Sequence, residues 1–257
     1  MQTETRTVFG KVPELTLLFW IIKVVATTLG ETAGDAVTMS MNLGYLVGTA
    51  IFMAIFIAAV AVQIRATQFR APLFWFVIVA TTTAGTTLAD FFDRSLGIGY
   101  AGGATTLSLL LLGSLAWWHK ALGSVSIDRI NSRRAEAFYW MTIMFSQTLG
   151  TALGDWFADP ENGLGLGYQG SALVFAAGLA VIAALYFWPK VSRTALFWAA
   201  FILTRPLGAA VGDFLDKPIA NGGLAMSRYS ASAALALFIV ACIVLVRQRA
   251  ERIDTRA

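Results

Sequence analysis

The chain has 257 residues, of which 57% are hydrophobic and only 13% are charged. Soluble domains carry about 25% charged residues, so this composition excludes a soluble globular enzyme and a disordered chain and indicates a membrane protein. One cysteine, Cys242, and one histidine, His119, exclude an intrachain disulfide, a thiolate metal cluster and histidine-rich haem, copper or zinc sites. We therefore expect no covalently bound cofactor.

Eight apolar segments are long enough to cross a membrane. A hydrocarbon core of about 30 Å needs about 20 apolar residues in a helix. The connections between the segments are short and leave no room for a separate soluble domain. The sequence thus predicts an all-α integral membrane protein with a single membrane domain over 1–257 and eight transmembrane helices: Leu15–Ala36, Leu43–Val62, Ala71–Phe92, Tyr100–Trp118, Ala137–Phe157, Tyr168–Trp188, Ala195–Leu215 and Tyr229–Val246.

The chain is built from four tandem copies of a two-helix unit, at 15–64, 71–118, 137–188 and 195–246. Each odd-numbered segment opens with an aromatic residue followed by Trp, with Gly ten residues, a small residue fourteen residues and Asp fifteen residues after the Trp. Two segments per unit make the repeats parallel. The Trp, Gly and Asp of the four copies are Trp20, Gly30 and Asp35; Trp75, Gly85 and Asp90; Trp140, Gly150 and Asp155; Trp198, Gly208 and Asp213.

The basic residues predict the orientation. The termini and the loops between repeats hold most of the 19 Lys and Arg residues, and the loops within repeats hold only Arg94, Lys217 and Arg228. The positive-inside rule then places both termini in the cytoplasm. We interpret the basic excess as this topology signal and not as nucleic-acid binding. The residues on the cytoplasmic side are Arg6, Lys11, Arg65, Arg70, Lys120, Arg129, Arg133, Arg134, Lys190, Arg193, Arg247, Arg249, Arg252 and Arg256.

Charge inside the predicted spans is confined to the odd-numbered segments. A charged residue at the bilayer centre costs about 2.5–3.5 kcal/mol on insertion scales, so such residues should face the bundle interior or a wet cavity. We therefore expect four inner odd helices and four outer, lipid-facing even helices. The seven residues are Lys23, Glu31, Asp35, Asp90, Asp155, Arg205 and Asp213.

Positions 7, 11 and 15 after each Trp share one helical face, because steps of four residues keep to one side of a helix. Fifteen residues rise roughly 22 Å, which puts the Asp layer in the outer part of the core. The small residues at positions 10 and 14 lie on the adjoining face and allow close helix packing. The face residues are Thr27, Glu31 and Asp35; Thr82, Thr86 and Asp90; Gln147, Thr151 and Asp155; Arg205, Ala209 and Asp213, with Thr28, Thr83, Thr148 and Pro206 at position 8.

These oxygen donors suit a hard cation such as Mg²⁺, Mn²⁺ or Ca²⁺, or else H⁺ or Na⁺. The five acids outnumber the two bases, Lys23 and Arg205, which we expect to compensate charge in the empty state. We expect Glu31 and Asp35 to be primary metal ligands and the other three Asp to complete an acidic chamber. The predicted site residues are Glu31, Asp35, Asp90, Asp155 and Asp213 as ligands, with Thr28, Thr83, Gln147 and Thr148 lining the path.

Structural roles remain open for several of these residues. The repeated Asp could accept backbone N–H bonds, and Arg205 could neutralise a carboxylate of a neighbouring helix. Glu31 is unrepeated among the four copies, which suggests function. We interpret the aromatic pairs as interfacial anchors. The outer acids Asp93, Asp159, Glu161 and Asp216 are interpreted as solvated loop charges, with ion entry or exit as the alternative.

The helix that begins at an aromatic-Trp pair and ends in a small-x-x-x-small-Asp pattern, as in 28–35 and 147–155, resembles bacterial integral membrane proteins made of four tandem two-helix repeats of unknown function. The resemblance covers about residues 15–246. It implies an uncharacterised membrane-anchored protein of the bacterial inner membrane with eight spans. It does not supply an activity that could be carried over to this chain. Repeat four departs from the pattern at Arg205-Pro206.

The leading hypothesis is a secondary transporter or exporter of a small hard cation, a divalent metal such as Mn²⁺ or Mg²⁺. Proton- or sodium-coupled carriage of a small organic solute, with Arg205 binding its anionic group, is the alternative. A third is a non-transporting scaffold in which the acids only form packing pairs. We do not expect an enzyme, because no nucleophile elbow or phosphate loop is present. The expected partners are the cation or solute, the lipid bilayer and, left open, further copies of the chain, without nucleic acid.

Overall fold

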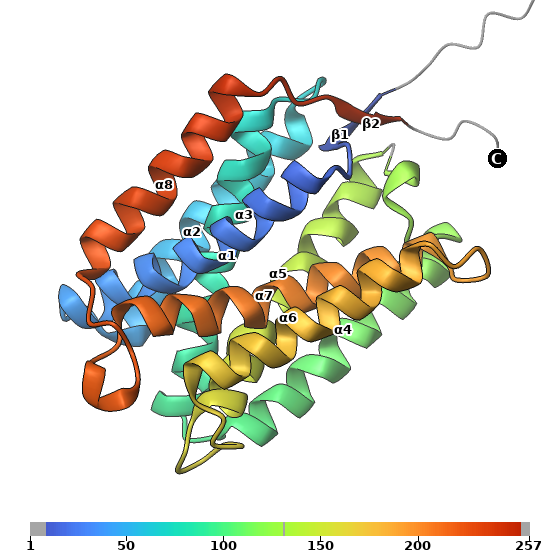
Figure 1. Ribbon diagram of the computed structural model, residues 1–257. Coiled ribbons are helices and arrows are strands. Elements are labelled where there is room, and N and C mark those ends of the chain that lie inside the picture. Colours follow the sequence, from blue (N-terminus) through green and yellow to red (C-terminus); the bar gives the residue numbers. More distant parts are fainter. Residues whose placement is uncertain (1–8, 131, 253–257) are drawn as a thin grey trace, which may run out of the picture.

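A computed structural model describes residues 9–130 and 132–252 (Figure 1). Arg6 and Arg256, which contributed to the predicted orientation, lie outside these ranges. Within them the chain folds into eight long helices and two short strands. Their bounds are β1 Phe9–Pro13, α1 Leu17–Asp35, α2 Gly44–Arg65, α3 Ala71–Asp90, α4 Tyr100–Leu122, α5 Arg133–Ala158, α6 Gly167–Tyr186, α7 Arg193–Asp216, α8 Arg228–Leu245 and β2 Ala250–Arg252.

The eight helices confirm the predicted all-helical fold. Seven of those in the described residues are long and apolar enough to cross a membrane. The exception is α5, which is 26 residues long and has Ser146, Gln147 and Thr148 in succession near its middle. It also begins at Arg133, four residues before the predicted start, because the side chain of Ser132 accepts a hydrogen bond from the backbone N–H of Ala135 at 3.2 Å and caps the helix there.

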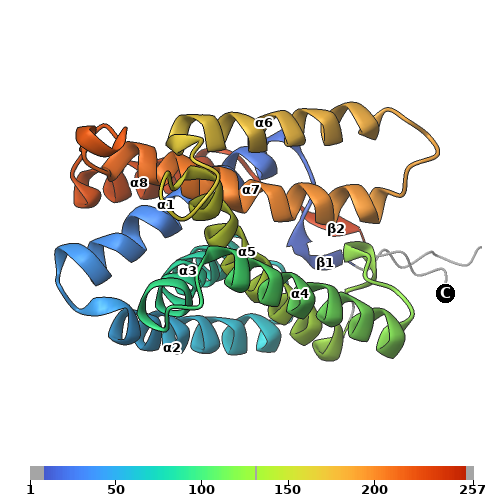
Figure 2. The ribbon, with the colours of Figure 1, turned by 90° about the horizontal axis from the view of Figure 1, so that it is seen from below.

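The four odd-numbered helices form a closed ring. α1 packs on α3, α3 on α5, α5 on α7, and α7 on α1. Each even helix packs on the odd helix of the following repeat, so that α2 covers α3, α4 covers α5, α6 covers α7 and α8 returns to cover α1 (Figures 1 and 2). Of the candidate membrane spans, those of α1, α3 and α7 are 61%, 67% and 67% buried, whereas those of the even helices are 11–33% buried.

Glycine ten residues after each Trp lets neighbouring ring helices approach closely. Each glycine faces the side chain seven residues after the Trp of the next odd helix, and the series closes from α7 back to α1. A Cβ on Gly30 would lie 2.9 Å from Cβ of Thr82, and one on Gly85 would lie 3.0 Å from Cβ of Gln147. The other two pairs around the ring are Gly150 with Arg205 and Gly208 with Thr27.

We call these contacts between a glycine of one ring helix and a side chain of the next the glycine interlock. The small residues fourteen positions after the Trp extend it by one helical turn. Gly34 faces Thr86, Gly154 faces Ala209, and Gly212 faces Glu31. Each is again a contact between one odd helix and the next, at the residue eleven positions after its Trp. The small-x-x-x-small pattern therefore sets both the spacing and the vertical register of the ring helices.

The aromatic pairs are not interfacial anchors, and that interpretation was wrong. Of their eight rings only Trp20 is partly exposed; Phe19, Phe74, Trp75, Tyr139, Trp140, Phe197 and Trp198 are each at most 5% exposed. They pack edge-on or tilted against each other across the ring, with centroids 5.0–6.5 Å apart. Burial of large rings against each other removes more apolar area from water than a belt position would. The helix starts are therefore joined by an aromatic cluster.

The two described ends of the chain meet beside this aromatic cluster. β1 and β2 pair antiparallel, which joins the segment before repeat one to the segment after repeat four (Figure 2). Lys11 of β1 donates to the carbonyls of Gln63, Ile64 and Ala66 at the end of α2 and pairs with Glu136 of α5. These contacts join β1 to β2, α2 and α5 at the aromatic end of the ring.

Replacing Gly30 with Ala should destabilise the protein by about 1–3 kcal/mol, because the new Cβ would overlap the side chain of Thr82 on α3. Gly113→Ala in α4 is the matched control, since a Cβ at Gly113 meets nothing within 4 Å. That variant should match or exceed the wild-type stability. Thermal unfolding of the detergent-solubilised protein measures the stability of both variants. Equal unfolding midpoints would contradict the close contact between Gly30 and Thr82.

Candidate functional site

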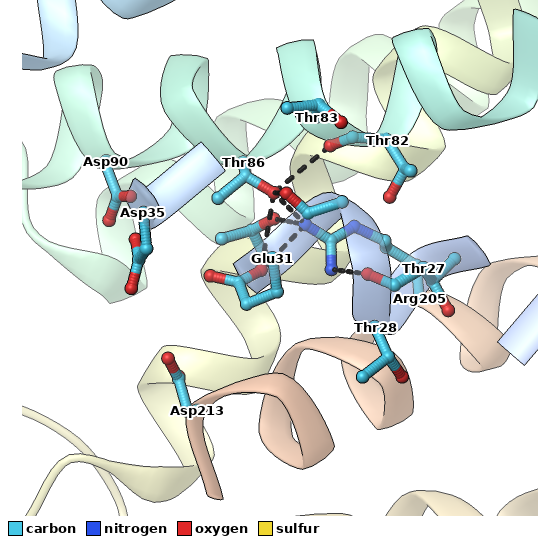
Figure 3. A network of polar contacts seen from close by, with 12 residues as sticks. Thr27, Thr28, Glu31, Asp35, Thr82, Thr83, Thr86, Asp90, Arg205 and Asp213 are labelled. Atoms are coloured by element: carbon cyan, nitrogen blue, oxygen red, sulfur yellow. Dashed lines mark hydrogen bonds and ion pairs between the residues drawn. The ribbon is translucent and has the colours of Figure 1, made fainter. Parts of the chain in front are cut away.

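The four repeated aspartates lie together at the end of the ring opposite the aromatic cluster. Their side chains come from the last turns of α1, α3, α5 and α7 and are almost fully buried, at 0–6% exposed. Figure 3 shows Asp35 and Asp90 side by side, with Asp213 below Glu31. After Asp35 and Asp90 the helices continue as single π turns, Ala36–Ser40 and Phe91–Ser95. Such turns are frequent at functional sites.

One turn below these aspartates, Arg205 is the centre of a network that includes all four ring helices. Its Nη2 donates to Oε2 of Glu31 at 2.9 Å and also to the hydroxyls of Thr86 and Thr151, while Nη1 donates to the carbonyl of Thr27 at 3.4 Å (Figure 3). All five residues are at most 2% exposed. The two hydrogens of Nη2 are shared among three acceptors, and the buried Nε has no partner among the described residues. The burial of the guanidinium is therefore compensated by one acid and by hydrogen bonds at its two terminal nitrogens.

Two further basic side chains join the aspartates in pairs. Arg94 pairs with Asp90 of its own repeat and with Asp155 of the next, each at 3.0 Å. Lys217 pairs with Asp213 of its own repeat at 3.1 Å and with Asp35 of α1. Both bases lie four residues after the aspartate of their own repeat, so each reaches from one ring helix to the next.

Three of the five predicted ligands converge. One carboxylate oxygen each from Glu31, Asp35 and Asp213 lies within 4.8 Å of the other two. Asp90 and Asp155 are not part of this group and are held instead by Arg94. Within the group, Oδ1 of Asp35 is fully buried and has no hydrogen-bond partner. This leaves one acceptor of the group without the compensation that buried polar atoms require.

A cavity of about 410 Å³ reaches this end of the ring between α5 and α7. Its lining includes Asp155, Asp213, Tyr100, Tyr168 and Arg94. Asp159 and Glu161, from the loop that follows α5, also line the cavity. Four acids against one base give the lining an excess of negative charge.

The hydroxyl groups predicted to line the path are bonded within their own helices. Thr28, Thr83 and Thr148 donate to the carbonyls four residues earlier, at 3.1, 2.8 and 2.9 Å. In this structure those donors are therefore directed to the helix backbone and not to a ligand. Gln147 is fully buried, and neither amide atom of its side chain has a partner.

Lys23 lies apart from the acids. It is fully buried, its Nζ has no hydrogen-bond partner, and the ammonium nitrogen lies 4.1 Å from the centroid of the Phe201 ring. Among the described residues it forms no ion pair with a carboxylate, in contrast to Arg205, which pairs with Glu31 at 2.9 Å. Charge compensation in the acidic cluster thus comes from Arg205, Arg94, Lys217 and Arg228, whose Nε lies 3.8 Å from Oδ2 of Asp35.

The interpretation of four outer acids as solvated loop charges was wrong for two of them. Asp93 and Asp216 are 7% and 6% exposed. Asp216 accepts from Nε of Arg228 at 3.1 Å, and the carboxylate of Asp93 packs against Gly103 of α4. The physical reason is position: both residues are still on the helical turn that packs against the ring. Glu161 is exposed, as expected.

Arg94 and Lys217 were not predicted as partners of the aspartates. Their spacing carried a signal, since a base four residues after an acid lies on the same helical face. Repeats one and three have Met39 and Asp159 at this position, so the pattern appears in alternate repeats only.

Outside the helical spans, the charge states of two groups follow from their contacts. Burial lowers the pKa of Lys217, but the carboxylates of Asp213 and Asp35 raise it more, and the pKa lies above its usual value. The side chain is therefore an ammonium at neutral pH. Partial burial raises the pKa of Asp159, but hydrogen bonds from the backbone N–H groups of Asn162 and Glu161 lower it more, so the pKa lies below its usual value.

Comparison with protein families finds four tandem matches to one family, described as a Repeat of Unknown Function (DUF347), at residues 18–69, 73–123, 138–192 and 196–252. These matches confirm the resemblance and the four-repeat organisation. No curated protein and no solved structure matches the chain.

Removing either partner of the buried pair between Arg205 and Glu31 should destabilise the protein by about 3–5 kcal/mol, because the remaining charge is left buried without its counter-ion. Arg205→Met and Glu31→Gln should each lower the thermal unfolding midpoint, and the double variant should recover part of the loss. A double-mutant cycle measured in detergent tests this. Strictly additive effects would contradict a direct coupling between the two side chains.

Proposed function

Since the chain belongs to the Repeat of Unknown Function (DUF347) family, whose description names no activity, we propose its function from the geometry of the ring. We infer that the protein is a secondary transporter of a small hard cation, a divalent metal such as Mn²⁺, with the ion bound among acids at one end of the ring. The observation that carries this proposal is the convergence of Glu31, Asp35 and Asp213 within 4.8 Å.

The surface of the even helices supports a position in the bilayer. Large apolar side chains on α2, α4, α6 and α8 are more than half exposed, which suits contact with lipid tails and not with water. In the proposed arrangement the ring helices lie inside and the even helices face lipid. Both termini lie in the cytoplasm and the acidic end faces outward, in a bacterial inner membrane. The exposed side chains include Leu46, Ile57, Leu109, Leu112, Leu173, Val181, Leu237 and Val244.

The chemistry of the acidic group suits a hard cation. Carboxylate oxygens are the ligands that Mg²⁺ and Mn²⁺ prefer, and three ligands leave positions for water. The free Oδ1 of Asp35 supplies an acceptor that no protein donor uses. Four bases, Arg94, Lys217, Arg205 and Arg228, pair with six acids, the five predicted ligands and Asp216, so negative charge remains in excess even with every pair formed.

A specific observation favours the second candidate, a carrier of a small organic solute. The cavity of about 410 Å³ is larger than a single ion needs, and Tyr100 and Tyr168 give it aromatic walls. In this alternative Arg205 binds the anionic group of the solute. Arg205→Lys would then change solute affinity and leave Mn²⁺ binding unchanged. The scaffold alternative predicts no stabilisation of the purified protein by any ligand in a thermal-shift titration.

Glu31→Gln and Asp35→Asn should each abolish Mn²⁺ uptake into proteoliposomes that hold the purified protein, because each removes a charged ligand of the acidic group. Asp128→Asn, on the loop at the aromatic end, is the matched control and should retain wild-type flux. Uptake is measured with a Mn²⁺-sensitive dye trapped in the vesicles. Full flux in both site variants would reject the assignment of the site.

A further inference from the structure

The two bridging bases divide the ring into two clasped pairs of helices. Arg94 joins Asp90 to Asp155 and so clasps α3 to α5. Lys217 joins Asp213 to Asp35 and so clasps α7 to α1. Each base reaches forward around the ring in the same sense, because both occupy the same position in their repeats, nineteen residues after the Trp.

The other two seams, α1 with α3 and α5 with α7, have no basic side chain bridging their repeated aspartates in the part of the chain that the structure describes. The corresponding position holds Met39 in repeat one and Asp159 in repeat three, and neither can donate to a carboxylate as a cation does. The cavity lies at one of these seams, with Asp155 of α5 and Asp213 of α7 in its wall. A cation that enters there meets two carboxylates without a base between them.

Lys217 lies between the cavity and the convergent group of Glu31, Asp35 and Asp213, on the path of a cation that enters through the cavity. Its ammonium lies between Asp213, which borders the cavity, and Asp35, which belongs to the convergent group. The residue follows the last residue of α7, so its side chain can leave without a change in the ring helices. Oδ2 of Asp35 faces both Lys217 and, at 3.8 Å, Nε of Arg228, whereas Oδ1 of this fully buried side chain has no hydrogen-bond partner in the described chain and is free to accept a further positive group.

We propose that Lys217 is a tethered competitor of the transported ion: the cation enters through the cavity at the α5–α7 seam and displaces the ammonium from between Asp213 and Asp35. This inference rests on the proposed function. In the empty protein the ammonium pairs with both carboxylates, offsets one of their two negative charges and clasps α7 to α1. A divalent cation brings two charges in place of one, and its binding releases the side chain of Lys217 to the cavity side.

The test compares the Mn²⁺ affinity of the wild-type full chain with that of Lys217→Met, both purified in detergent and titrated with MnCl₂ by thermal shift. Loss of the competitor should lower the half-saturating Mn²⁺ concentration about tenfold, since a site that is free for only about a tenth of the time weakens the apparent affinity by that factor. Lys190→Met, in the exposed loop between α6 and α7, is the matched control and should leave the midpoint concentration unchanged.

A charge-restoration experiment separates competition from packing. In a Cys242→Ser background, Lys217→Cys is treated with 2-aminoethyl methanethiosulfonate, which attaches an ammonium through a disulfide, or with methyl methanethiosulfonate, which attaches a neutral group. The aminoethylated protein should return toward the weaker wild-type affinity, and the methylated protein should keep the tight binding. If Lys217→Met does not fold, Lys217→Gln retains a hydrogen-bond donor to Asp35 without the charge and should show the same tightening.

The outcomes distinguish the two levels of the proposal. Equal Mn²⁺ affinity in wild type, Lys217→Met and both modified forms would overturn the competitor role and leave cation binding itself intact. Absence of any Mn²⁺-dependent shift in wild type and every variant would overturn the proposed function, and the competitor role with it. Tightening that the attached ammonium reverses supports both.

Discussion

The close contact between glycine on one ring helix and a side chain of the next is the constraint on which the other features depend. Because Gly30, Gly85, Gly150 and Gly208 have no Cβ, the residue seven positions after each Trp can pack directly against the neighbouring backbone. The same register places the residues eleven and fifteen positions after each Trp in successive layers. The aromatic cluster at one end and the acidic cluster at the other follow from one repeated spacing.

The interior of this ring departs from fourfold equivalence where charge is concerned. Three charged residues in the ring have no charged counterpart at the same position of the other copies: Lys23, Glu31 and Arg205. Arg205 forms an ion pair with Glu31 and donates hydrogen bonds to threonine hydroxyls of α3 and α5, whereas the ammonium of Lys23 contacts only the aromatic ring of Phe201 among the described residues. An amine buried inside a bundle without a hydrogen-bond partner is costly, and no described contact other than the Phe201 ring offsets that cost.

Between them, Arg94 and Lys217 hold the four repeated aspartates as two pairs. A buried carboxylate without a counter-ion would be strongly unfavourable, and four at one level would repel each other. The bases reduce this repulsion and leave the α5–α7 seam open at a cavity with an acidic lining. An acidic site that is closed by the chain's own cations is chemically suited to an exchange of one cation for another.

The sequence by itself determined the helical fold, the four repeats, and the small residues and aspartates, because all of these are set by spacing along a single helix and by composition. Only the tertiary structure decided that the aromatic pairs are buried and that the hydroxyls of Thr28, Thr83 and Thr148 donate within their own helices. It also decided that Arg94 and Lys217 each pair with an aspartate of the next ring helix. These outcomes depend on which helix lies next to which and in what order. Contacts between residues more than 60 positions apart are set by packing, which helical periodicity alone does not specify.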